Sequence, residues 1–164
     1  RSPKMQSVMN LKIKFRESFR PFAPIVLREH ASDYFEIDPK HDSPYMLIVA
    51  PVRDDKRLKV EPGLVGLDKL KQLRSVIPAV THVDNSARLQ TVDGEHNPRL
   101  AAMMRSFHKR TGSPVLINTS FNVRGEPGTD MDVLVLENFV IRRTAQKNMP
   151  EVDREKYLAA FALD

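Results

Sequence analysis

Short hydrophobic and polar runs alternate along the chain, and this pattern predicts strands mixed with helices. A nearly unbroken apolar run at residues 45–52, between two prolines, is typical of a buried strand. Apolar residues at helical spacing follow Asn97 and Pro98 as far as Arg110, and Gly112 comes soon after them, so we predict a capped helix there. Further strands are predicted at residues 25–27, 80–92, 114–119 and 133–140, and further helical segments at residues 2–12, 31–37, 67–73 and 150–163.

These elements follow one another without an internal repeat or a low-complexity tract. Such an order predicts an α/β or α+β fold, a twisted mixed sheet flanked by helices. The 164 residues are enough for one domain, and 41% hydrophobic with 29% charged residues is ordinary for a soluble globular protein. We therefore predict a single domain over residues 1–164.

Cysteine is absent from the chain, which excludes disulfides and thiolate metal sites. A chain without disulfides fits the reducing cytoplasm. No apolar run approaches the ~20 residues that cross a bilayer. The first residue is arginine rather than methionine, which suggests a processed product or a fragment.

The formal net charge of +5 suits an anionic partner such as a nucleotide, a phosphorylated metabolite or nucleic acid. A solvated basic surface would give the same balance, so the charge alone leaves both interpretations open. The positions of the cations narrow the choice.

One group of cations lies in residues 14–24, where Lys14, Arg16 and Arg20 alternate with phenylalanines. Two prolines in this stretch exclude a continuous helix and predict a loop. Lysine and arginine combine a fixed charge with several N–H donors, which is what phosphate oxygens require. A basic amphipathic edge with aromatic core anchors is the alternative.

A second polar group, residues 118–126, directly follows a predicted strand. Loops at the carboxyl ends of strands are favoured ligand sites in α/β folds. Ser120 lacks the G-x-S-x-G elbow of a nucleophile, so we interpret it as a hydrogen-bond donor to a phosphate or carbonyl group. An ordinary polar turn is the alternative.

His82, Asp84 and Arg88 form a third group. Two candidate ligands are too few for a metal site, so none is predicted, and we expect His82 to be structural. Arg88 is better suited to bind an anion. Taken together, the three groups offer fixed cations without a clear general base, a set that can stabilise charge during phosphoryl or acyl transfer.

The chain resembles the C-terminal domain of the NodU/CmcH/TobZ family of O-carbamoyltransferases from residue 1 to about residue 142. Four segments carry the resemblance: MNLKIKFRESFRPFAPIVL, SPYM, IPAVTHVDNSARLQTV and TGSPVLINTSFNVRGEP. The resemblance implies a YrdC-like fold, similar to that of threonylcarbamoyl-adenosine synthases and of part of HypF. It also implies that carbamoyl phosphate and ATP with Mg²⁺ are converted to carbamoyladenylate and pyrophosphate.

The same resemblance implies a larger cytoplasmic enzyme. Its N-terminal domain, of the actin/Hsp70 type, would bind a metal ion and transfer the carbamoyl group to an acceptor hydroxyl. That domain is absent here, so its metal is not expected on this chain. After Pro127 the family continues with a strand and a helix, and a segment of about a dozen residues or more is expected to be missing.

By motif, the resemblance assigns roles to eight residues of this chain. Catalytic roles go to Lys14, Arg20, Ser120 and Asn122. Substrate or nucleotide binding goes to Arg16, Arg88, Thr119 and Arg124. We expect these side chains to converge on one concave face.

Two other functions are kept as alternatives, namely an RNA-binding module and a purely structural YrdC-like module without catalysis. The RNA alternative is weakened because no stripe of exposed aromatic residues accompanies the basic groups. No membrane partner is expected.

Overall fold

The computed structural model describes residues 2–14, 16–120, 131–145, 156 and 159–160. The chain divides into two compact units. The first comprises Arg1–Gln6 and Pro21–Thr119, and the second comprises Ser7–Arg20 and Ser120–Asp164.

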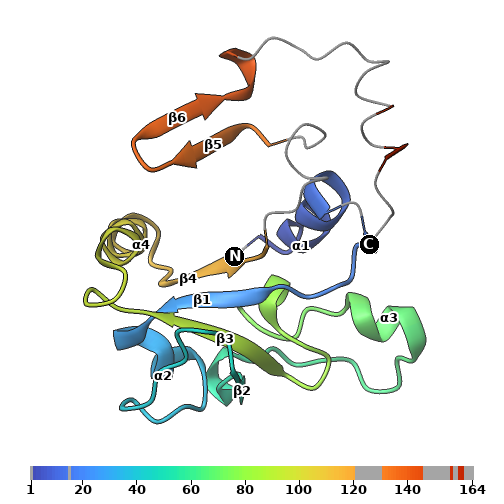
Figure 1. The fold of residues 1–164 in the computed structure, drawn as a ribbon. Helices are drawn as coiled ribbons and strands as arrows, with labels where there is room; N and C mark the ends of the chain where they lie inside the picture. Colours follow the sequence, from blue (N-terminus) through green and yellow to red (C-terminus); the bar gives the residue numbers. More distant parts are fainter. Residues whose placement is uncertain (1, 15, 121–130, 146–155, 157–158, 161–164) are drawn as a thin grey trace. The chain divides into compact units, whose positions relative to one another are not determined.

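A mixed four-stranded sheet forms the centre of the first unit, with the strand order β2-β3-β1-β4 (Figure 1). The strands are β1 Ala23–Leu27, β2 Ile48–Pro51, β3 Ser86–Val92 and β4 Val115–Asn118. β1 runs parallel to β3 and antiparallel to β4, while β2 runs antiparallel to β3. The predicted α/β class with a mixed sheet and flanking helices is therefore confirmed.

Helix α4, Pro98–Thr111, packs on one face of this sheet. Ala101 and Met104 lie one helical turn apart and contact a buried cluster with Ile25, Leu27 and Val92 of β1 and β3. Because side chains alternate between the two faces of a strand, Ile25 and Leu27 define the face that α4 covers.

The ends of α4 agree with the prediction in part. Gly112 ends the helix in the left-handed conformation, with φ of 68°, which glycine adopts at no steric cost. Pro98 occupies the first turn as expected. Asn97 precedes it, but its side chain makes no capping hydrogen bond, so this part of the predicted cap is wrong.

In Figure 1, α2 (Ala31–Tyr34) and α4 lie on opposite sides of the sheet. A 3₁₀ turn, Arg28–His30, joins β1 to α2. Val26 and Leu89, which point away from α4, are completely buried, so the α2 side of the sheet is also part of the core.

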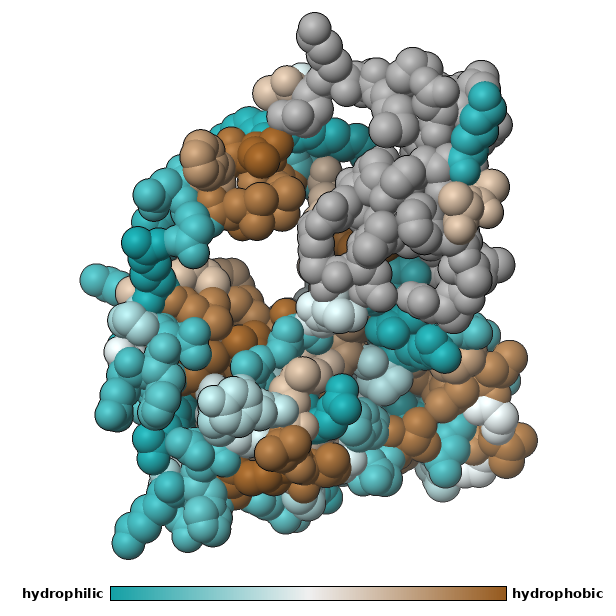
Figure 2. Space-filling model, in the orientation of Figure 1, coloured by the Kyte–Doolittle hydropathy of each residue, from teal (hydrophilic) through white to brown (hydrophobic). Residues whose placement is uncertain are grey.

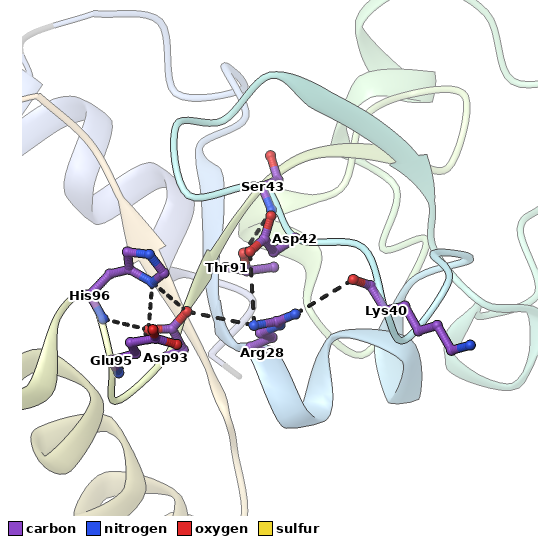
Figure 3. A network of polar contacts seen from close by, with 8 residues as sticks. All are labelled: Arg28, Lys40, Asp42, Ser43, Thr91, Asp93, Glu95 and His96. Atoms are coloured by element: carbon purple, nitrogen blue, oxygen red, sulfur yellow. Dashed lines mark hydrogen bonds and ion pairs between the residues drawn. The ribbon is translucent and has the colours of Figure 1, made fainter.

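A polar network ties the loop after α2 to the end of β3 (Figure 3). Arg28 lies 3.9 Å from a carboxylate oxygen of both Asp42 and Asp93. The backbone N–H of Ser43 donates to the Thr91 hydroxyl at 2.8 Å, and the Thr91 N–H donates to the Ser43 carbonyl at 3.0 Å. The segment at Ser43 is therefore fixed against β3.

The predicted buried strand at residues 45–52 is shorter and more exposed than expected. β2 is an edge strand, and the residues Tyr45, Leu47 and Val49 are 79%, 84% and 58% exposed. The apolar run alone could not reveal that this strand lies at an exposed edge of the sheet, because the run has the same appearance in an edge strand and in a central one. Figure 2 shows hydrophobic groups reaching the surface between hydrophilic ones.

The remaining elements of the first unit lie close to their predicted positions. α3, Gly66–Lys71, corresponds to the predicted helix at residues 67–73. The predicted strand at residues 80–92 is shorter, because a turn at residues 82–85 precedes β3.

The second unit contains a π-helical segment, Asn10–Lys14, that continues directly from α1, Met5–Met9. The predicted end of this helix before Ile13 is therefore wrong, because the wider turn carries the helical backbone to Lys14. π-helical turns are rare and occur frequently at functional sites.

A two-stranded hairpin, β5 Val133–Leu136 and β6 Phe139–Arg142, replaces the single strand predicted at residues 133–140. The chain reverses at Glu137, whose φ of 51° is typical of tight hairpin turns. The predicted helix at residues 150–163 lies almost entirely outside the described residues. None of the helices among the described residues has the length and apolar character needed to cross a bilayer.

Candidate functional site

Asn10 organises the loop that carries the three predicted cations. Its side chain is completely buried. The Nδ2 group donates to the carbonyl oxygens of Arg20 at 2.8 Å and Ser18 at 3.2 Å, and Oδ1 accepts from Nε of Arg16 at 2.7 Å. The Arg16 backbone N–H closes the loop by donating to the Asn10 carbonyl at 3.1 Å. One amide therefore uses both its donor and its acceptor atoms to fix residues 10–20.

Lys14 ends the π-helical segment and is buried, with 8% of its surface exposed. Its ammonium group donates to the Ser120 carbonyl at 2.9 Å and to the Ser120 hydroxyl at 3.2 Å. The structure thus brings together two predicted site residues that lie far apart in the sequence. A buried cation requires such close polar partners, because desolvation of an ammonium group is costly.

Arg20 is exposed at the end of the same loop. Its Nε lies 3.3 Å from a carboxylate oxygen of Glu17, and 46% of the Arg20 side chain and 54% of the Glu17 side chain are exposed. Surface ion pairs of this kind contribute little free energy. Arg20 can therefore exchange Glu17 for an anionic ligand at small cost.

In the first unit, Arg88 lies on β3 with an exposed side chain. This side chain has no hydrogen-bond or ion-pair partner among the residues that the structure describes. Gln90 follows two positions later and so shares the same sheet face. Asn118, at the end of β4, donates from Nδ2 to Oε1 of Gln90 at 2.5 Å, which places it on that face as well. Arg88, Gln90 and Asn118 therefore form a polar group on the sheet face that α4 covers in part.

The predicted site residues are divided between the two units. Arg88 and Thr119, which directly follows β4, belong to the first unit, and Lys14, Arg16, Arg20 and Ser120 belong to the second. Asn122 and Arg124 lie outside the described residues. Convergence of the eight residues on one face therefore stays a prediction.

The predicted structural role of His82 is confirmed. Nδ1 of His82 lies 3.0 Å from the Ser86 hydroxyl, and that hydroxyl donates to Asp84 at 2.7 Å. The hydrogen bonds from the Ser86 hydroxyl and N–H hold the pKa of Asp84 below its usual value. The three residues form a turn that leads into β3. Among the described residues, no group of three or more His, Cys, Asp or Glu side chains is placed to hold a metal ion.

A cavity of about 410 Å³ in the first unit is a different feature from the predicted site. It is lined by His30, Asp33, Tyr34, Arg53, Asp55, Lys56, His108 and Pro114. Lys56 and Arg53 both donate to the Asp55 carboxylate, at 2.7 and 2.9 Å, and these bonds lower the pKa of Asp55 to about 2. Because two carboxylates, those of Asp33 and Asp55, share this lining with the two cations, the cavity is a weaker candidate for binding phosphate.

Two residues of the described site, Asn10 and Gln90, were not singled out from the sequence, and Asn118 was predicted only as the first residue of the polar segment 118–126. A signal exists for Asn10, because it is a polar residue of low helix propensity beside helical apolar positions. Asn118 opens the polar segment that was noted after the strand, whereas Gln90 carries no signal in the sequence that separates it from a solvated strand residue.

Comparison with known proteins gives a consistent result. The family model described as "Carbamoyltransferase C-terminus" matches residues 1–143. An uncharacterized protein, sll1178, of Synechocystis sp. is 53% identical over 180 aligned positions, which cover all of this chain and 29% of that protein. Two nodulation proteins of Sinorhizobium fredii are each 40% identical: NolNO, with 82% of this chain and 19% of the relative covered, and nodulation protein U, with 76% and 19%.

The chain spans less than a third of the length of each of these relatives. The 180 positions aligned with the Synechocystis protein also exceed the 164 residues of this chain, so that relative has additional residues within the matched region. The alignment length does not locate them. The segment expected to be missing after Pro127 lies outside the described residues and stays a prediction.

Proposed function

The chain belongs to the carbamoyltransferase C-terminus family, and on this premise we propose that it activates carbamoyl phosphate with ATP and Mg²⁺ to form carbamoyladenylate. The observation that best supports this proposal is the pairing of buried Lys14 with Ser120, beside the loop that Asn10 fixes. The pair and the loop give a cation, a hydroxyl and two arginines held by a few directional bonds.

The proposed reaction balances when phosphate and pyrophosphate both leave. Water cleaves carbamoyl phosphate to carbamate and phosphate, and a carbamate oxygen then attacks the α-phosphorus of ATP and displaces pyrophosphate. Negative charge is redistributed over phosphate oxygens in both steps, so fixed N–H donors are the main requirement and no protein nucleophile is needed. Mg²⁺ enters as part of the ATP substrate and offsets phosphate charge.

The chain's own residues divide this work. In the proposal, Lys14 and Arg20 hold the carbamoyl phosphate and the adenylate, and Ser120 donates a hydrogen bond to the same groups. Asn122 acts with Ser120, while Arg16, Arg88, Thr119 and Arg124 bind substrate and nucleotide. Arg88 is suited to this role because its guanidinium is exposed and has no partner among the described residues.

The proposal for the whole protein extends beyond this chain. The greater length of the relatives leaves room for a further domain. We propose that this domain is N-terminal, binds its own metal ion and transfers the carbamoyl group to an acceptor hydroxyl. We place this O-carbamoyltransferase in the cytoplasm and assign this part of it a YrdC-like fold.

Calorimetric titration of the chain with Mg²⁺-ATP and with carbamoyl phosphate tests the proposal, beside a Lys14→Ala/Arg20→Ala variant. We expect both ligands to bind the parent chain and the variant to lose at least about 100-fold in affinity, because each charge-assisted hydrogen bond contributes ~1.5–3 kcal/mol. A Lys69→Ala/Lys71→Ala variant removes the same charge from exposed positions of α3 and should bind normally.

Three results would contradict the proposal. Normal binding by the Lys14→Ala/Arg20→Ala variant would show that the site lies elsewhere. If neither ligand binds the parent chain, the alternative of a purely structural module would be favoured. Salt-dependent RNA binding without ATP binding would favour the RNA alternative.

A further inference from the structure

The side-chain amide of Asn118 lies at the end of a short chain of hydrogen bonds in the first unit. This series of hydrogen bonds begins at the carbonyl oxygen of Pro44, which accepts from Nε2 of Gln90 at 2.7 Å. Oε1 of Gln90 accepts in turn from Nδ2 of Asn118 at 2.5 Å. Nδ2 of Asn118 also lies 3.3 Å from the sulfur atom of Met46.

The donor and acceptor of each hydrogen bond in this series follow from its starting point. A backbone carbonyl can only accept a hydrogen bond, so Gln90 must turn its NH₂ group to Pro44 and its oxygen to Asn118. Asn118 must therefore turn its NH₂ group to Gln90, and Met46 takes up the other N–H direction. Both donors of the Asn118 amide are engaged, and Oδ1 is left as an acceptor.

The starting point is itself held firmly. Ser43, the residue before Pro44, exchanges two hydrogen bonds with Thr91, the residue after Gln90, at 2.8 and 3.0 Å. Figure 3 shows this contact beside the network around Arg28. Ser43 and Thr91 are buried, with 3% and 4% of their surface exposed. The Pro44 carbonyl and Gln90 are thus held at a fixed spacing, and their hydrogen bonds determine the orientation of the Asn118 amide.

Oδ1 of Asn118 has no hydrogen-bond partner among the described residues, and Asn118 is only partly buried. It shares its sheet face with the exposed guanidinium of Arg88. This face therefore offers an exposed cation, suited to a phosphate group, and an oriented acceptor, suited to an N–H donor. A ligand with both a phosphate group and an amide N–H matches this pair.

We propose that Oδ1 of Asn118 accepts a hydrogen bond from the carbamoyl NH₂ group, so that Asn118 determines specificity for carbamoyl over acyl substrates without N–H donors. Gln90 is the positioning residue that fixes the Asn118 amide. This inference rests on the proposed function. Carbamoyl phosphate and acetyl phosphate share nearly the same shape and charge and differ in NH₂ against CH₃. An acceptor that faces CH₃ loses its partner, and an unsatisfied polar group is costly.

The test compares the affinities of carbamoyl phosphate and acetyl phosphate for the full chain. We expect the parent chain to prefer carbamoyl phosphate about tenfold, as one hydrogen bond to a partly exposed acceptor allows. Asn118→Leu keeps the number and branching of the side-chain heavy atoms and should reduce the preference to about one. Gln90→Leu leaves Asn118 in place but frees its amide to rotate, and should reduce the preference to about two- to threefold, chiefly through weaker binding of carbamoyl phosphate.

Gln72→Leu is the matched control, because Gln72 lies outside this face and donates to the Glu61 carbonyl at the surface. It should keep the tenfold preference. Thermal melting verifies that each variant folds, and Asn118→Ser replaces Asn118→Leu if the latter does not fold.

The outcomes separate this inference from the proposed function. Loss of preference in the Asn118 and Gln90 variants, with retained acetyl phosphate binding, supports the inference. An equal preference in all variants, or no preference in the parent chain, overturns the inference. In either case, binding of the acyl phosphates to the parent chain leaves the proposed function intact. If neither acyl phosphate binds the parent chain, the proposed function fails and this inference fails with it.

Discussion

Replacement of Asn10 by alanine should release the loop that presents Lys14, Arg16 and Arg20. The Asn10 side chain is completely buried and makes three hydrogen bonds, two to backbone carbonyls and one from the Arg16 guanidinium. Alanine removes all three and leaves the two carbonyl oxygens and the Arg16 Nε without that partner.

The magnitude follows from the kind of each bond. A neutral hydrogen bond contributes about 1 kcal/mol and one to a charged group ~1.5–3 kcal/mol, which gives an upper bound of about 5 kcal/mol. Ser18 and Arg16 are only partly buried, so water replaces part of what is lost. We therefore expect the closed loop to lose about 3 kcal/mol, equivalent to a change of ~150-fold in its opening equilibrium.

Hydrogen exchange measures this opening directly. The backbone N–H groups of Arg16 and Arg20, which are bonded to the carbonyls of Asn10 and Glu17, should exchange on the order of 100-fold faster in Asn10→Ala. Asn10→Asp should behave similarly, because its carboxylate still accepts from Arg16 but cannot donate to the carbonyls.

Asn97→Ala is the control for this measurement, since the Asn97 side chain makes no capping hydrogen bond. It should leave exchange at Arg16 and Arg20 unchanged. Parent-like exchange in Asn10→Ala would refute the conclusion that this amide holds the loop.

Three further predictions concern stability. Asp93 raises the pKa of His96, and hydrogen bonds from His96 lower the pKa of Asp93, so this pair should stabilise the fold most between about pH 3.8 and 6.5. The contribution is lost as pH rises through the raised pKa of His96 or falls through the lowered pKa of Asp93. Thermal melting of His96→Gln beside the parent across pH 3–9 should therefore show a difference in stability that is largest in that window. A difference independent of pH would contradict the pairing. Arg74→Met should raise the free energy of unfolding, measured by urea titration, by about 1 kcal/mol, because Nη2 of the buried Arg74 has no partner among the described atoms. A lower free energy of unfolding would show that the remaining hydrogen bonds of Arg74 outweigh the cost of the unpaired Nη2. Gly112→Ala should cost about 1 kcal/mol in the same urea titration, because alanine is strained at φ of 68°, and an unchanged midpoint would contradict the left-handed helix end.

Local patterns predicted the elements whose signals are complete within a few residues. Helix α4 has an apolar stripe, a proline in its first turn and a glycine after its last, and the structure places it within about one residue of the expected bounds. The hairpin of β5 and β6 was missed, because the Glu137 turn contains neither glycine nor proline to interrupt the apolar run.

The site was predicted less completely, because its organisation depends on contacts between distant segments. Cations and hydroxyls can be recognised from residue type, so Lys14 and Ser120 are predictable as site residues without knowledge of the contact between them. The role of Asn10 depends on where the carbonyls of Ser18 and Arg20 return to it, and the role of Gln90 depends on the fixed carbonyl of Pro44. A short sequence pattern does not determine where these carbonyl groups lie in space.

Isotope exchange tests the central claim most directly. Labelled pyrophosphate is incubated with the chain, Mg²⁺ and ATP, with and without carbamoyl phosphate. Reversible formation of carbamoyladenylate predicts that label enters ATP only when carbamoyl phosphate is present, and that Lys14→Ala abolishes this exchange. Binding of both substrates without any label in ATP would contradict adenylate formation by this chain.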